Sequence, residues 1–112
     1  MKKITILTFS LLCLFAVSCR RNDFRTVIIH VPGMKHKACA ERIVNAARRR
    51  SSGPEGSENI RINMDERTVI VTYNSLKHSL KNIEHDIAKS GFTANNVPAD
   101  PRAREQLPPE CR

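Results

Sequence analysis

The sequence lacks the short motifs that mark the common classes of catalytic site. It contains no phosphate-cradling glycine-rich loop, no G-x-S-x-G motif and no C-x-x-C redox pair. The carboxylates of Asp65, Glu66, Glu84 and Asp86 show no pairing that suggests general acid/base catalysis. We therefore expect a binding protein rather than an enzyme.

Long apolar runs are also missing beyond the first twenty positions. No later stretch of eighteen uncharged apolar residues exists, which excludes a polytopic membrane protein. The 112 residues allow one domain, and 40% hydrophobic with 27% charged residues suit a small globular one. The 19 Lys and Arg outnumber the 11 Asp and Glu, so anionic lipid headgroups are expected as nonspecific neighbours.

The first segment is typical of an export signal. Residues 1–3 are a basic start, and residues 4–17 are uncharged, largely apolar and too short to span a bilayer comfortably. The run FAVSC resembles a bacterial lipoprotein signal, in which Cys19 is lipidated and becomes the mature N-terminus, although Ala16 stands where Leu is usual. The second interpretation is ordinary secretion with cleavage at the same bond, and the third is an anchor helix that is retained in the membrane.

This interpretation places the mature protein in the periplasm or cell envelope. Residues 1–18 are the signal peptide, residues 19–25 a polar tether, and a lipidated Cys19 would anchor the chain stably in a membrane. Nucleic acid is not expected as a partner there. Only two thiols remain after processing, those of Cys39 and Cys111, and outside the cytoplasm they could pair as a disulfide.

Hydrophobic periodicity predicts the order strand, helix, strand, strand, helix, strand. Apolar residues alternate in the strands and recur at i, i+3, i+4 and i+7 in the helices. Met64 falls on the core face by this alternation, and Gly91 is expected to end the second helix. The expected elements span residues 26–31, 38–49, 59–64, 68–73, 75–90 and 92–97, and residues 98–112 are expected to be a Pro-containing, extended tail.

The predicted fold class is α+β, a ferredoxin-like βαββαβ sandwich over residues 26–97. One face of its sheet would be buried under the two helices. Such a fold does not by itself define a function, so the function must be argued from a site.

The turn between the first strand and the first helix carries the candidate site. His36 and Cys39 are three residues apart, and Cys39 falls in the first helical turn, where free N–H groups and the helix dipole stabilise a thiolate. Thiolate and imidazole together suit soft and borderline metal ions. Gly33 permits a tight turn and Met34 can fill the core beneath the loop. Taken alone, the same spacing also fits a solvated His and a small Cys packed at a helix start.

The stretch VPGMKHKACAERI resembles the heavy-metal-associated (HMA) domain, the module of copper chaperones and metal-transporting P-type ATPases. Gly33 and Met34 match its G-M-x-C-x-x-C motif, Cys39 matches the second Cys, and His36 stands where the first Cys belongs. The later segment KSGFTA resembles the family's G-[YF]-x-A loop, whose aromatic residue, here Phe92, lies close to the metal loop in that family. The resemblance covers residues 26–97 and implies the same ferredoxin-like fold.

The exchange of Cys for His leaves an incomplete site. One imidazole and one thiolate hold Cu(I) less well than two thiolates and make a better partial site for Zn(II) or Cu(II). Cys111 is the candidate third ligand, since the tail could reach back across a small domain. It could equally be a free or disulfide-paired thiol, and a Cys39–Cys111 disulfide would abolish thiolate binding until reduced. His30, His78 and His85 are expected to be solvated.

The sequence thus favours a noncatalytic domain that binds, and transfers or sequesters, a copper or zinc ion, with copper as the first choice. The metal ligands would be His36, Cys39 and Cys111, and a metal-transporting protein would be the partner. One alternative is a metal-free interaction module, in which Arg48–Arg50 could dock an acidic partner. The other is a thiol-redox protein that uses Cys39 and Cys111.

Overall fold

The computed structural model describes residues 21–112, so Cys13, the predicted signal peptide and the predicted lipidation site at Cys19 lie outside the described residues. The elements are β1 (Phe24–His30), α2 (Lys37–Arg48), β2 (Ile60–Asn63), β3 (Thr68–Asn74), α3 (Leu80–Lys89), α4 (Pro101–Glu105) and the 3₁₀ turn η2 (Pro109–Cys111). Within the described part of the chain, no helix is long and apolar enough to cross a bilayer.

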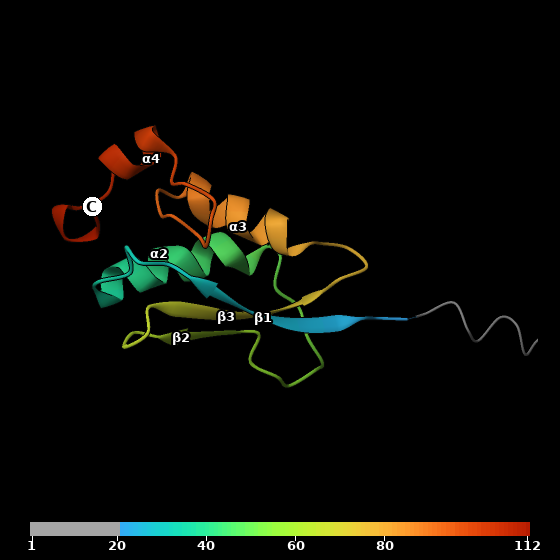
Figure 1. The fold of residues 1–112 in the computed structure, drawn as a ribbon. Helices are drawn as coiled ribbons and strands as arrows, with labels where there is room; N and C mark the ends of the chain where they lie inside the picture. The colour runs from blue at the N-terminus through green and yellow to red at the C-terminus, as the bar shows by residue number, and fades with distance from the viewer. Residues whose placement is uncertain (1–20) are drawn as a thin grey trace, which may run out of the picture.

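The three strands form an antiparallel sheet in the order β1-β3-β2, and α2 and α3 cover one of its faces (Figure 1). The register sets Ile29 of β1 and Ile62 of β2 on either side of Val69 in β3. Because successive strand residues point to opposite faces, this register directs one apolar row toward the helices. The expected α+β, ferredoxin-like sandwich is confirmed.

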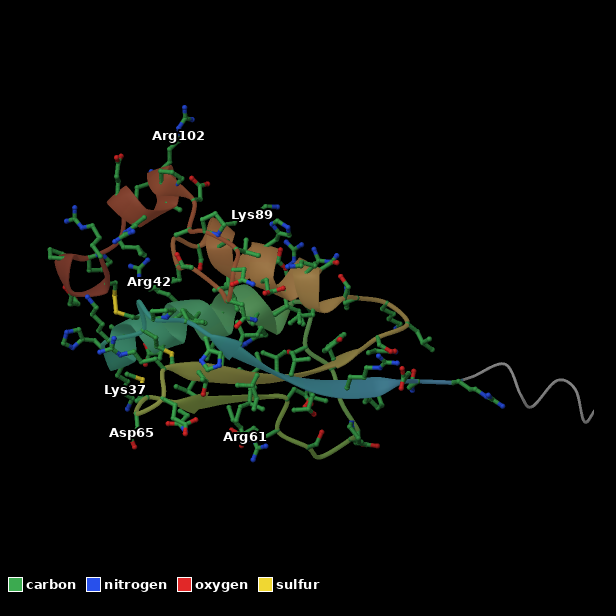
Figure 2. All side chains as sticks on the ribbon, viewed as in Figure 1. Lys37, Arg42, Arg61, Asp65, Lys89 and Arg102 are labelled. Carbon is green, nitrogen blue, oxygen red and sulfur yellow. A yellow bond between two sulfur atoms is a disulfide. The ribbon has the colours of Figure 1, made fainter. Side chains whose placement is uncertain are left out.

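The core lies between the sheet and the two helices. Ile29, Val69, Ile43, Ile83 and Ile87 are all completely buried. The opposite sheet face is open, and Ile28 is 59% exposed there. Side chains on this open face, such as Arg61, point away from the helices (Figure 2).

The predicted last strand over residues 92–97 does not form. Only an isolated bridge joins Ala94 to Val97. Asn95 adopts a positive φ of 49°, which turns the chain out of an extended path. Asn95 still occupies the place beside β1, because its N–H donates to His30 O at 2.8 Å and its Oδ1 accepts from His30 N at 2.9 Å.

The second helix is shorter than predicted. It begins at Leu80, and Ser79 is its N-cap, whose hydroxyl accepts from Asn82 N at 3.3 Å. Residues 75–77 form a turn instead, in which Asn74 Oδ1 accepts from Leu76 N at 3.1 Å. Leu76, an apolar residue inside the predicted helix range, is therefore 64% exposed. Gly91 follows the helix with φ +104°, the conformation expected of a glycine that ends it.

Two edges of the sheet also differ from the prediction. β1 begins at Phe24, inside the predicted tether, and Asp23 just before it accepts from Ser75 N through its carbonyl at 2.8 Å. β2 ends at Asn63, so Met64 lies in the following turn and is 37% exposed. The prediction that Met64 packs in the core was wrong, because alternation holds only while the strand continues.

The tail is folded rather than extended. Asp100 caps α4 by accepting from Arg102 N at 3.0 Å, and Pro101 occupies the first helical turn. An Asp-Pro pair is a known helix-start signal, because Asp caps free N–H groups and Pro presets φ. The red C-terminal segment then lies on the helix side of the sandwich, at the end where α2 begins (Figure 1).

Candidate functional site

The loop between β1 and α2 is held by its backbone and by one buried side chain. Met34 N donates to Val31 O at 3.0 Å and Lys35 N to Gly33 O at 2.9 Å, so the chain reverses over Gly33. Met34 is completely buried and fixes the loop to the core. His36 follows as the extended N-cap residue of α2, without a side-chain cap hydrogen bond.

Cys39 lies in the first turn of α2, as the sequence predicts. Its N–H donates to His36 O at 3.0 Å, and its side chain is completely buried. The first turn of a helix concentrates free N–H groups and the positive end of the dipole. A thiolate released at this position would therefore be stabilised.

A disulfide joins Cys39 to Cys111, across 72 residues of sequence, with 5.7 Å between the two Cα atoms. The side chain of Cys111, at the end of η2, is only 3% exposed. Figure 2 draws the bond in yellow between α2 and the C-terminal segment. The structure thus brings two of the three predicted ligand residues together, in the paired form that the sequence left open.

Noncovalent contacts also hold the tail beside this bond. Asp100 N donates to Ala88 O at 2.9 Å, and Leu107 is 4% exposed. A Cβ at Gly91 would lie 2.9 Å from Leu107 Cδ1 and 3.0 Å from the backbone of both Ala103 and Arg104. The tail therefore packs directly on Gly91, and no larger residue leaves room for it.

Phe92 supports the loop from below. It is 1% exposed, and its Cδ1 would lie 3.3 Å from a Cβ at Gly33. The ring consequently touches the backbone of the loop that precedes α2. Glycine at position 33 allows this close approach.

His36 is the third predicted ligand residue, in addition to the two cysteines of the disulfide. His36 is exposed, and among residues 21–112 no group of three His, Cys, Asp or Glu is poised around a common point. With both sulfurs bonded to each other, this structure describes the oxidised site. The role of His36 as a ligand stays a prediction about the reduced one.

The other histidines and the Arg48–Arg50 run have separate environments. His30 and His85 are exposed, whereas His78 Nδ1 is half-buried 3.2 Å from Arg50 Nη1. Arg50 also forms an ion pair with Asp86 at 2.8 Å. Arg50 is thus engaged within the fold, and only its two exposed neighbours remain for an acidic partner.

No family model matches the sequence, and no curated protein matches it. Among solved structures, oxidised MerP from Ralstonia metallidurans CH34 is similar at 25% identity and TM-score 0.56, over 65% of this chain and 96% of that one. A putative copper-ion-binding protein from Bacillus anthracis is similar at 25% identity and TM-score 0.56, over 67% and 100%.

A third similar structure is the N-terminal domain of a potential copper-translocating P-type ATPase from Bacillus subtilis in its Cu(I)-loaded state. It shares 26% identity and a TM-score of 0.55, over 65% of this chain and 86% of that one. The described chain therefore has an HMA-like fold. The shared part corresponds in extent to a single such domain.

The docked tail is the feature that sequence reasoning missed. Two local features of the sequence indicate a folded tail: Asp100-Pro101 is typical of a helix start, and Leu107 is a lone apolar residue in a polar segment. The packing of the tail on Gly91 could not be predicted from these features, because local patterns do not show which distant segments come into contact.

Proposed function

We propose that this chain binds a soft or borderline metal ion, copper first and zinc second, through Cys39 and Cys111 once their disulfide is reduced. The observation that carries the proposal is the convergence of the two sulfurs at the start of α2, from positions 72 residues apart. In this arrangement Cys111 supplies the second sulfur that the H-x-x-C loop lacks. Two thiolates are the donors that soft ions such as Cu(I) prefer.

Copper is favoured over zinc by the number of donors. Two thiolates satisfy Cu(I), whereas a structural zinc site needs four ligands in a tetrahedron. His36 is the proposed third ligand; it lies in the exposed loop, one helical turn before Cys39. A site of two sulfurs and one nitrogen would suit Cu(I) and would hold Zn(II) only with an outside ligand.

The metal ion is cargo in this proposal, and the domain is not an enzyme. An incoming thiolate or imidazole from a partner would join the ion before a bond to the domain breaks. The exposed loop around His36 gives such a donor access. The similarity to a domain of a potential copper-translocating ATPase supports a metal-transporting protein as that partner.

The test is a Cu(I) titration of the reduced protein against a competing chromophoric chelator. The reduced wild type is expected to take Cu(I) from the chelator, and the oxidised wild type is not. Cys39→Ser and Cys111→Ser should each lose this competition, and His36→Ala should weaken it. His85→Ala is the matched control, since His85 is exposed on α3, away from the loop. Equal binding by wild type and both Cys variants would refute the proposal.

A structural staple is the second candidate, and burial favours it. Both cysteines are nearly inaccessible, and the bond closes the chain over a long loop, which typically stabilises a protein by about 2–4 kcal/mol. In that case the bond would persist for stability alone. Reduced wild type that stays folded but cannot compete for Cu(I) would establish this function instead.

We also propose export and lipid anchoring through Cys19. The basic start, the apolar run and the FAVSC sequence support it, and the Cys39–Cys111 disulfide suits an oxidising compartment. In a bacterial host the full chain is expected in the membrane fraction with acyl chains on Cys19 by mass spectrometry. Cys19→Ala should fail to be acylated, and an unacylated wild type in the soluble periplasmic fraction would favour ordinary secretion.

A further inference from the structure

A cavity of about 400 Å³ lies beside the disulfide, on the side of Cys111. Its walls come from the loop after β1, the residue before β3, the segment after α3 and the folded tail. Cys111 lines this cavity and Cys39 does not. The volume falls within the range of small-molecule sites, roughly 300–1,000 Å³.

Every charged side chain that lines the cavity is basic. These side chains belong to Lys35, Arg67, Arg104 and Arg112. Arg67 is held at the rim, because its Nη1 donates to Pro32 O at 3.3 Å. Glu110, next to Cys111 in sequence, is exposed and is not part of the lining. Positive charge from three separate segments therefore converges on one cavity, which concentrates anions there.

The two sulfurs differ in how an incoming thiol could reach them. Cys39 is completely buried inside a regular helix, whereas Cys111 forms part of the cavity wall on a three-residue turn near the end of the sequence. Because η2 is a separate three-residue turn, opening it would expose Cys111 while α2 stays in place. The sulfur that leaves is then Cys39, at the helix start, where the dipole favours a thiolate and so makes it the better leaving group.

We infer that this cavity admits a carboxylated low-molecular-weight thiol, which opens the disulfide at Cys111 and releases Cys39 as the thiolate. The inference rests on the proposed metal site for its purpose, because reduction frees the two sulfur ligands. The carboxylates of the thiol would bind Arg67 and Arg104, and its sulfur would face Cys111. The basic cavity thereby favours an anionic thiol as the reductant of the Cys39–Cys111 disulfide.

The chemistry proceeds in two exchanges. The thiolate RS⁻ attacks Cys111 Sγ, the Cys39–Cys111 bond breaks, and its electron pair leaves on Cys39 Sγ. A second RS⁻ then attacks the sulfur of the bound R group and releases the Cys111 thiolate with RSSR. Two equivalents of thiol are oxidised to one disulfide while the protein disulfide is reduced to two thiolates.

The test compares the rate of disulfide opening by three thiols: mercaptosuccinate, which is anionic, 2-mercaptoethanol, which is neutral, and cysteamine, which is cationic. Rates are expressed per thiolate and corrected for intrinsic nucleophilicity. At low ionic strength mercaptosuccinate is expected to react about tenfold or more faster than 2-mercaptoethanol, as electrostatic steering typically gives. This advantage should vanish in about 1 M salt, where the Debye length is about 3 Å.

Substitutions locate the effect. Arg67→Gln and Arg104→Gln should each reduce the advantage of mercaptosuccinate and leave the rate with 2-mercaptoethanol unchanged. Arg61→Gln is the matched control, since Arg61 is exposed on β2 and does not line the cavity. An equal loss in the Arg61 variant would show a general charge effect and overturn the inference.

Trapping identifies the attacked sulfur. After a short reaction and alkylation with iodoacetamide, peptide mapping is expected to find the mercaptosuccinate adduct on Cys111 and the alkyl group on Cys39. Equal rates for the three thiols, or an adduct on Cys39, would overturn the inference. Neither readout involves metal, so it can fail while Cu(I) binding holds, and the reverse also applies.

Discussion

The sandwich and the tail of this protein are stabilised in different ways. The sandwich is held by strand pairing and by a continuous core that includes Ile29, Val69 and Ile83. The tail after Asp100 buries only Leu107 and Cys111, and its covalent link is the bond to Cys39. We therefore expect the sandwich to stay folded when the tail is released, whereas the proposed two-sulfur site needs the tail because Cys111 belongs to it. Reduction of this one bond would then change the proposed site without unfolding the domain.

The largest expected effect is in the sandwich. Ile29→Ala removes a completely buried side chain between the sheet and the helices, so the free energy of unfolding should fall by about 2–5 kcal/mol. Chemical denaturation monitored by circular dichroism measures this loss. Ile28→Ala is the control on the open face of the same strand, with an expected change within about 0.5 kcal/mol. Similar losses in both variants would contradict the assigned core face.

The next effect concerns the disulfide. Cys111→Ser should lower the free energy of unfolding by about 2–4 kcal/mol, because the unfolded chain is no longer closed into a long loop. The circular dichroism of the sandwich should be retained, and trypsin should cleave faster after Arg102 and Arg104 in the released tail. A variant that is unfolded in the absence of denaturant would show that the sandwich needs the bonded tail to fold.

Gly91 tests the noncovalent docking of the tail. Gly91→Ala places a Cβ 3.0 Å from the backbone of Ala103 and Arg104 at a φ of +104°. The left-handed backbone conformation alone should lower the free energy of unfolding by roughly 1–2 kcal/mol. The crowding should also displace the tail, so that trypsin cleaves it faster. Gly56→Ala is a matched control, because Gly56 has φ +80° with nothing within 4 Å of its Cβ. Equal tail cleavage in both variants would exclude packing on Gly91.

The smallest effect is at the start of β1. The Ser75 hydroxyl, and after it Arg25, lower the pKa of Asp23 below its ordinary value of 3.8. A carboxyl whose pKa is lowered in the folded state stabilises the protein at pH values above 3.8. This contribution is lost as the pH falls through the pKa of the folded state. Asp23→Asn should therefore be slightly less stable than wild type at pH 7, with a difference that disappears in acid. A difference that does not depend on pH would exclude the carboxylate as its source.

Much of the fold could be read from the sequence, because alternation and helical periodicity directly report which residues face the core. Ile29 and Val69 lie at alternating apolar positions of the predicted strands, and both are completely buried. The errors fall where a local interaction ends the pattern. Asn95 turns the last segment out of a strand, and Asn74 and Ser79 delay the second helix. Side-chain hydrogen bonds of Asn and Ser compete with regular structure, and periodicity does not register them.

The site could be located but not completed from the sequence. The motif placed Cys39 at the first turn of α2, which the structure shows. The pairing with Cys111 stayed open, because both a free and a bonded thiol are compatible with the spacing. The basic cavity was not visible at all, since Lys35, Arg67 and Arg104 come from segments that only the folded chain brings together.

The most direct test of the central claim is X-ray absorption at the copper edge of the reduced, Cu(I)-loaded protein. If Cys39 and Cys111 together hold the ion, wild type will show two sulfur neighbours and Cys111→Ser will show one. The same number of sulfur neighbours in both proteins, or no copper retained by reduced wild type, would contradict the two-sulfur site.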